Sequence, residues 1–197
     1  LEEASLHAEE AIRQSGDDHT LVGRMRLTQA IASHWLGHYV DAESQAIAAM
    51  EKLERGTTGW YAALGHVAMA GGHRGHGARM GALVEDLLQT AAGDHPGRAV
   101  AACRLVVQLV RTGAPDRAAE LLAALDGSGA ARAAVEPFVR AWIAAARAEL
   151  ALHEGDPMRY MELIKESVDD FVAAGDIRNA SLQRSNIGNA YLQLGGY

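Results

Sequence analysis

The stretch Leu36-Gly37-His38-Tyr39, which precedes an alanine-rich run, has a counterpart at the end of the sequence, Leu194-Gly195-Gly196-Tyr197. The interval between the two tyrosines divides into four units of about 40 residues, a period typical of stacked helical hairpins. A small or aromatic residue near the start of each expected second helix keeps the same loose period, at Ala4, Ala42, Ala78, Ala118 and Tyr160. The sequence therefore predicts an all-α fold, a right-handed superhelical array of about five antiparallel helix hairpins.

Composition agrees with closely packed helices. Hydrophobic residues make up 49% of the chain, aromatic residues only 5%, and there are 4 prolines in 197 residues. Alanine and leucine dominate the apolar share, which favours helices over strands. We expect helices near residues 1–14, 20–36, 40–53, 60–70, 78–91, 97–111, 117–125, 130–153, 158–173 and 177–194, separated by short polar turns.

Two segments depart from this regular pattern. The run from Gly71 to Gly77 holds four glycines and two histidines, and it predicts a loop that crosses between two helices. His73 and His76 are then expected to be solvent-exposed loop residues. Pro137 should kink or divide the helix expected at 130–153.

Charge and hydropathy exclude several classes of partner. The net charge is −7 and no basic cluster occurs, which argues against nucleic acid as a ligand. No run of 18 apolar residues and no signal sequence is present, so we expect no membrane association. The single cysteine, Cys103, lies in an apolar run and predicts a buried thiol in a reducing, cytoplasmic compartment.

The sequence begins at Leu1 and ends on a half-finished repeat. We therefore expect residues 1–197 to form a single helical repeat domain that is a piece of a longer protein, whose catalytic domain, if it has one, lies elsewhere. No cofactor is predicted.

Motifs at both ends resemble the tetratricopeptide repeat. Ile187-Gly188-Asn189-Ala190-Tyr191 with the following Gly-Gly-Tyr turn resembles the first half of such a repeat. Gly37-His38-Tyr39-Val40-Asp41-Ala42, with Ala49 seven residues on, resembles the second half. The match covers about a third of the chain and is poor in the centre, and the period exceeds the ~34 residues of the standard repeat.

The segment from Phe171 to Tyr191 is also similar to repeat regions of large bacterial signalling proteins, in which such hairpins follow a serine/threonine kinase, cyclase or ATPase domain. That resemblance implies a regulatory role in bacterial signalling. It implies no catalytic activity for this chain.

The tetratricopeptide resemblance implies that the first helix of each pair lines a groove that binds a peptide or protein partner. Asn189 resembles the position where the family often places an Asn that bonds to a peptide backbone. Trp35 is either an apolar anchor for the partner or is packed between hairpins. The candidate groove residues are Arg24, Thr28, Ile31, His34, Trp35, Ser185, Asn186, Asn189 and Gln193.

Histidines suggest an alternative. His34 and His38 are four residues apart, and His66, His73 and His76 are close in sequence, so they could supply metal ligands in a helical-bundle enzyme that uses the 66–76 region. No His-Glu-x-x-His motif accompanies them, and the glycine-rich segment lacks the ending of a phosphate-binding loop. Chance spacing is the preferred interpretation.

Two hypotheses therefore stand: a non-catalytic interaction scaffold without metal or cofactor, and the histidine-based metal enzyme. For the scaffold, the partner is a peptide, a protein or the adjacent domain of the same chain. Pairing of two copies into a homodimer through exposed terminal helices is left open.

Overall fold

A computed structural model describes residues 1–90, 95–127 and 136–193 of the chain. Within these ranges the fold is all helical, with no strand. The helices are α1 (Glu2–Gln14), α2 (His19–Trp35), α3 (Tyr39–Lys52), α4 (Thr58–His73), α5 (Gly77–Leu88), α6 (Pro96–Arg111), α7 (Pro115–Gly127), α8 (Pro137–His153), α9 (Pro157–Ala173) and α10 (Ile177–Gln193). The all-α prediction is confirmed, and the expected positions of the helices are close to the observed ones.

Prolines and glycines set the helix ends. All four prolines of the chain open a helix, α6, α7, α8 or α9, where the missing N–H has no helical partner to lose. Gly37 follows α2 with a φ of +79°, in the left-handed region that stops a helix. Pro137 is the first residue of α8, and the predicted helical stretch before it falls on residues 128–135, which lie outside the described ranges, so the kink or division at Pro137 stays a prediction.

Acidic side chains cap several helices. Asp18 accepts a hydrogen bond from the backbone N–H of Leu21 at 2.9 Å, and Asp156 accepts one from Arg159 at the same distance. These bonds satisfy amide groups that the first turn of a helix leaves free. The capping residues lie in the short turns that the sequence predicts.

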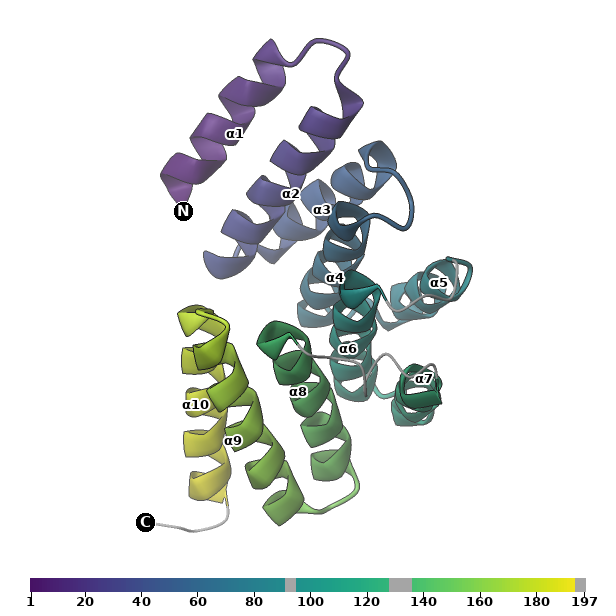
Figure 1. Cartoon of the computed structure of the whole chain (residues 1–197), viewed down its shortest axis with the longest axis vertical. Coiled ribbons are helices and arrows are strands. Elements are labelled where there is room, and N and C mark those ends of the chain that lie inside the picture. Colours follow the sequence, from purple (N-terminus) through teal and green to yellow (C-terminus); the bar gives the residue numbers. More distant parts are fainter. Residues whose placement is uncertain (91–94, 128–135, 194–197) are drawn as a thin grey trace.

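Consecutive helices pack on one another in a curved array. α2 contacts α3, α3 contacts α4, and α8, α9 and α10 follow in the same way at the other end. In the middle, α6 packs between α4 and α8, while α5 and α7 lie on the outer side of the curve (Figure 1). Among the described helices, none combines the length and the apolar character needed to cross a membrane.

Two apolar clusters form the core. The larger one runs from Ala30 of α2 to Ala180 of α10 and includes the fully buried Leu64, Leu105 and Phe171. The smaller one joins α8, α9 and α10 around Ile164. Cys103 is fully buried, as predicted, and burial raises the pKa of its thiol to about 12.

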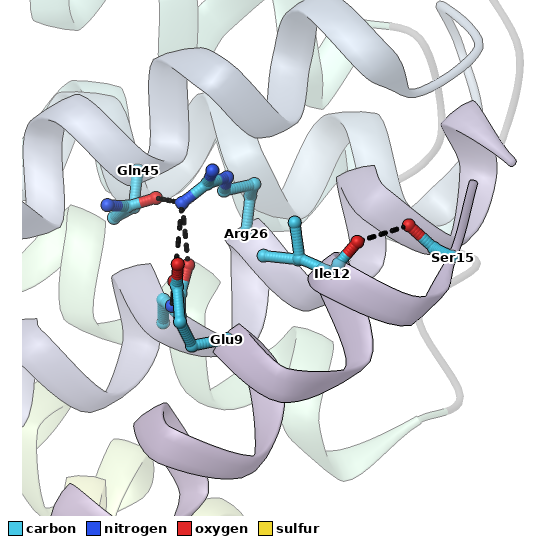
Figure 2. A network of polar contacts seen from close by, with 6 residues as sticks. Glu9, Ile12, Ser15, Arg26 and Gln45 are labelled. Carbon is cyan, nitrogen blue, oxygen red and sulfur yellow. Dashed lines mark hydrogen bonds and ion pairs between the residues drawn. The ribbon is translucent and has the colours of Figure 1, made fainter. Parts of the chain in front are cut away.

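Polar contacts tie α1, α2 and α3 together at one end of the array. Arg26 of α2 donates a hydrogen bond to Gln45 of α3 at 3.0 Å and forms an ion pair with Glu9 of α1 at 3.8 Å (Figure 2). Gln29 donates to the same Glu9 carboxylate at 2.8 Å. Since α1 buries only Ala8, these bonds set its position on α2.

The glycine-rich segment is largely helical, which corrects the predicted loop. α4 continues through Gly71 and Gly72 to His73, and α5 begins at Gly77. The side chain of Glu43 from α3, only 2% exposed, lies beneath the turn and accepts contacts from Arg74, His76 and Arg79. Burial raises the pKa of Glu43, but hydrogen bonds from His76 and Arg74 outweigh it and lower the pKa overall. His76 is therefore bound to a buried carboxylate and is only partly exposed, whereas His73 is exposed as predicted but is the last residue of α4 and not a loop residue.

Candidate binding site on the inner face

The inner side of the array holds a cavity of about 420 Å³. Figure 1 shows the helices that surround it, α2, α4, α6, α8 and α10. The residues that line it come from these five helices, from the turn after α2 and from the first residue of α3: His34, Trp35, Leu36, Gly37, Tyr39, Met69, His73, Arg104, Val107, Gln108, Arg111, Trp142, Ala145, Glu149, Leu182, Gln183 and Asn186. We call this cavity the inner pocket.

Helical periodicity explains why these side chains meet. Arg104, Gln108 and Arg111 of α6 are spaced i, i+4 and i+7, so they follow one face of that helix. On α8, Trp142 and Glu149 are likewise seven residues apart. On α6 and α8 the wall of the inner pocket is thus one face of a helix whose remaining residues are mostly buried in the core.

Arg104 is the most unusual residue of the inner pocket. It is only 8% exposed, and its guanidinium lies 4.7 Å from the centre of the Trp142 ring. The Nε atom is buried and has no hydrogen-bond partner, and within the described residues Arg104 forms no ion pair. Burial lowers the pKa of Arg104 to about 10, so the side chain is still charged at neutral pH.

A glycine on α4 makes room for this arginine. A Cβ atom built on Gly65 would lie 2.8 Å from Cδ of Arg104 and 3.2 Å from its Nη1. About two turns further along α4, a Cβ on Gly72 would overlap the side-chain amide of Gln108. The glycines of α4 therefore admit the polar face of α6.

Arg111 differs from Arg104 because it has a partner. It donates a hydrogen bond to Glu149 of α8, whose side chain is 13% exposed. The two charges cancel at one side of the inner pocket. Arg104 is left as a positive charge without a neighbouring carboxylate in contact with it.

His34, His66 and His73 form a cluster next to Trp35. The ring of His34 lies 5.9 Å from that of His66 and 5.8 Å from that of His73, and His73 stacks on Tyr39 at 4.2 Å. Burial lowers the pKa of His34 to about 4 and also lowers the pKa values of His66 and His73. These rings are neutral at pH 7.

The histidine cluster gives no support to the metal-enzyme hypothesis. Across the part of the chain that the structure describes, no group of three or more His, Cys, Asp or Glu residues could hold a metal ion. The observed trio also differs from the predicted pairing, since His38 follows α2 and does not line the inner pocket.

The predicted groove residues divide into two sets. His34, Trp35 and Asn186 line the inner pocket, and Asn186 donates a hydrogen bond to Gln183 at 2.9 Å. Trp35 is half-buried and lies 5.9 Å from the guanidinium of Arg178. The pocket lining does not include the others, which are Arg24, Thr28, Ile31, Ser185 and Asn189; Gln193 ends α10, and its side chain lies outside the described residues.

Sequence reasoning missed the pocket residues of the central helices, above all Arg104, Gln108 and Trp142. A signal was present, because Arg104 and Gln108 interrupt an otherwise apolar run at a spacing of four. Comparison of the chain with protein-family models, curated proteins and solved structures finds no match.

Proposed function

We propose that this chain is a non-catalytic interaction scaffold of the tetratricopeptide type. Its inner face binds a segment of a partner protein, or of an adjacent domain of the same protein, and the binding is regulatory in bacterial cytoplasmic signalling. The single observation that carries the proposal is the inner pocket, on which five helices converge. The sequence resemblance supplies the class of module and the cellular setting.

The lining of the inner pocket suits an extended peptide. Side-chain amides of Gln108, Gln183 and Asn186 can both donate to and accept from a peptide backbone. Apolar groups such as Trp35 and Val107 offer contact surface for side chains. Histidines that are neutral at pH 7 add no charge that would repel a peptide.

Neither the cysteine nor the acid near the inner pocket is placed for catalysis. The Cys103 thiol is protonated and fully buried, and it does not line the inner pocket. The acid of the pocket, Glu149, is held by Arg111. A binding role uses the side chains as they lie.

A peptide library displayed on phage and selected on the purified chain tests this proposal. For a selected peptide, we expect Asn186→Ala to weaken binding by about fivefold, the worth of one or two hydrogen bonds. The measurement is isothermal titration calorimetry, with circular dichroism to verify that the variant is folded.

Asn189→Ala provides the matched comparison, because Asn189 is exposed on α10 three residues from Asn186 and outside the pocket lining. Weaker binding in both variants would extend the groove along α10, and weaker binding in Asn186→Ala alone would confine it to the inner pocket. Unchanged affinity in both variants would contradict the proposed groove.

The terminal helices keep the dimer hypothesis open. Leu6 of α1 is 70% exposed and Leu192 of α10 is 60% exposed. Sedimentation of the purified chain over a range of concentrations measures whether these faces pair two copies.

A further inference from the structure

The charge on Arg104 has no counterpart inside the protein. Its Nε is buried without a partner, and neither a carboxylate nor a carbonyl of the described residues accepts a hydrogen bond from its other nitrogens. A charged group removed from water without a partner destabilises a fold. Such an arrangement is typical of a site whose partner is a ligand.

None of the three acids nearest to Arg104 forms an ion pair with it among the described residues. Glu149 forms an ion pair with Arg111, and Asp176 accepts two hydrogen bonds from Asn179. Asp176 raises the pKa of Arg104 only by a through-space attraction that is weaker than the effect of burial. Glu136 shares a second, smaller cavity of about 210 Å³ with Arg104 but forms no ion pair with it.

The surroundings of Arg104 define the chemistry of the missing partner. A planar guanidinium matches the two oxygens of a carboxylate. Trp142, Met69 and Val107 border the same space and suit an apolar stem. A phosphate dianion fits less well, because Arg111 is already neutralised and the carboxylate of Glu149 also faces the inner pocket.

We propose that the inner pocket binds a small amphipathic carboxylic acid in its ionised form. The carboxylate binds the guanidinium of Arg104, and the apolar stem lies against Trp142, Met69 and Val107. This site goes beyond the interaction scaffold, because it gives the inner face a small-molecule ligand of its own.

Octanoate, octan-1-ol and inorganic phosphate are the probes for this site. Trp35 and Trp142 both line the inner pocket, so the intrinsic tryptophan fluorescence reports occupancy, and thermal unfolding gives a second reading. We expect octanoate to change the fluorescence and to raise the unfolding temperature. Octan-1-ol has the same stem without the charge and should bind at least about tenfold more weakly, and phosphate should not bind.

Arg104→Met identifies the residue responsible. We expect octanoate to bind this variant at least about tenfold more weakly. The variant should also unfold at a higher temperature than the parent chain without ligand, because it removes an unpaired buried charge. Arg117→Met is the control, since Arg117 is a partly exposed arginine that contacts Glu85 outside the inner pocket.

Three results would overturn the proposal. They are octan-1-ol binding as tightly as octanoate, octanoate binding Arg104→Met as tightly as the parent chain, and no response to octanoate at millimolar concentration. The first and third are measured on the parent chain and do not depend on the folding of a variant. The scaffold proposal is tested separately, because its experiment measures how Asn186→Ala changes peptide affinity and does not involve Arg104.

Discussion

His34 is neutral in the folded chain because its ring is removed from water and lies near the charge of Arg104. The neighbouring rings of His66 and His73 have lowered pKa values for the same main reason, burial. Folding therefore selects the uncharged form of three histidines in one place. In the unfolded chain, a histidine takes up its proton near its ordinary pKa of about 6.5.

This difference predicts loss of stability in mild acid. As the pH falls from 6.5 towards 4, the unfolded chain binds a proton at His34 that the folded chain does not bind, so the free energy of unfolding decreases. The loss assigned to His34 is about 3 kcal/mol near pH 4, and His66 and His73 act in the same direction. Urea unfolding at several pH values measures it.

His34→Leu should reduce this dependence on pH, since one of the three groups is gone. His7→Gln is the control, because His7 is exposed on α1 and pairs only with Glu3. Equal slopes of stability against pH in His34→Leu and the parent chain would show that His34 is not held neutral.

α4 depends on glycine where it meets α6. Gly65 lies opposite the stem of Arg104, and the position is tight because an added Cβ would lie 2.8 Å from Cδ of this buried side chain. Glycine in the middle of a helix lowers the stability of the helix by about 1 kcal/mol relative to alanine. Such a glycine therefore indicates either a close approach of another side chain or a locally weak helix. Here the space around Gly65 indicates a close approach.

Gly65→Ala and Gly188→Ala form a matched pair that separates these effects. Gly65→Ala should lower the free energy of unfolding by about 2 kcal/mol because its methyl group overlaps Arg104. Gly188→Ala should raise it by about 0.5–1 kcal/mol, because nothing lies within 4 Å of the added carbon on α10. Chemical denaturation measures both, and equal shifts in the two variants would contradict the close approach at Gly65.

The elements show which parts of the fold the sequence predicts. Turn glycines such as Gly37 and Gly175 mark real helix ends because their positive φ angles are local properties. Gly71 and Gly72 would by the same reasoning indicate a helix end, but α4 continues through both. Here glycine is required because Glu43 and Gln108 pack closely against the helix. Propensity alone cannot reveal such tertiary contacts.

The candidate site was predictable only at its two edges. His34 and Asn186 lie on helices that carry the repeat motif, so their faces could be inferred. Arg104 and Trp142 lie on α6 and α8, whose sequences lack the motif, and their meeting depends on how the central helices stack. The close approach of Arg104 to Gly65 is likewise a property of the packed array.

Seen whole, the array has two cores of unequal size. The larger cluster runs from α2 to Phe171 of α9 and Ala180 of α10, whereas the smaller one joins only α8, α9 and α10 around Ile164. In a linear stack each element is stabilised by its neighbours, so the loss of one contact weakens its own end first. The outer part of α9 and α10, which holds the smaller cluster, should therefore open more readily than the rest.

Hydrogen exchange on two core variants measures this independence. Ile164→Ala should weaken its cluster by about 2–4 kcal/mol and speed exchange in α9 and α10 while leaving α2 to α4 unchanged. Leu64→Ala, in the larger cluster, should speed exchange from α2 to α8. The same exchange pattern in both variants would indicate a single cooperative unit instead.

The contact between Trp35 of α2 and Arg178 of α10 joins helices that are far apart along the chain. Each interface between neighbouring helices contributes a small rotation, so small differences in packing angle add up along the array from α2 to α10. Bending of the array is therefore largest at this junction. A molecule that spans the junction resists deformation of the entire arc. Residues of both α2 and α10 line the inner pocket, so a change in the angle between these two helices changes the width of its entrance.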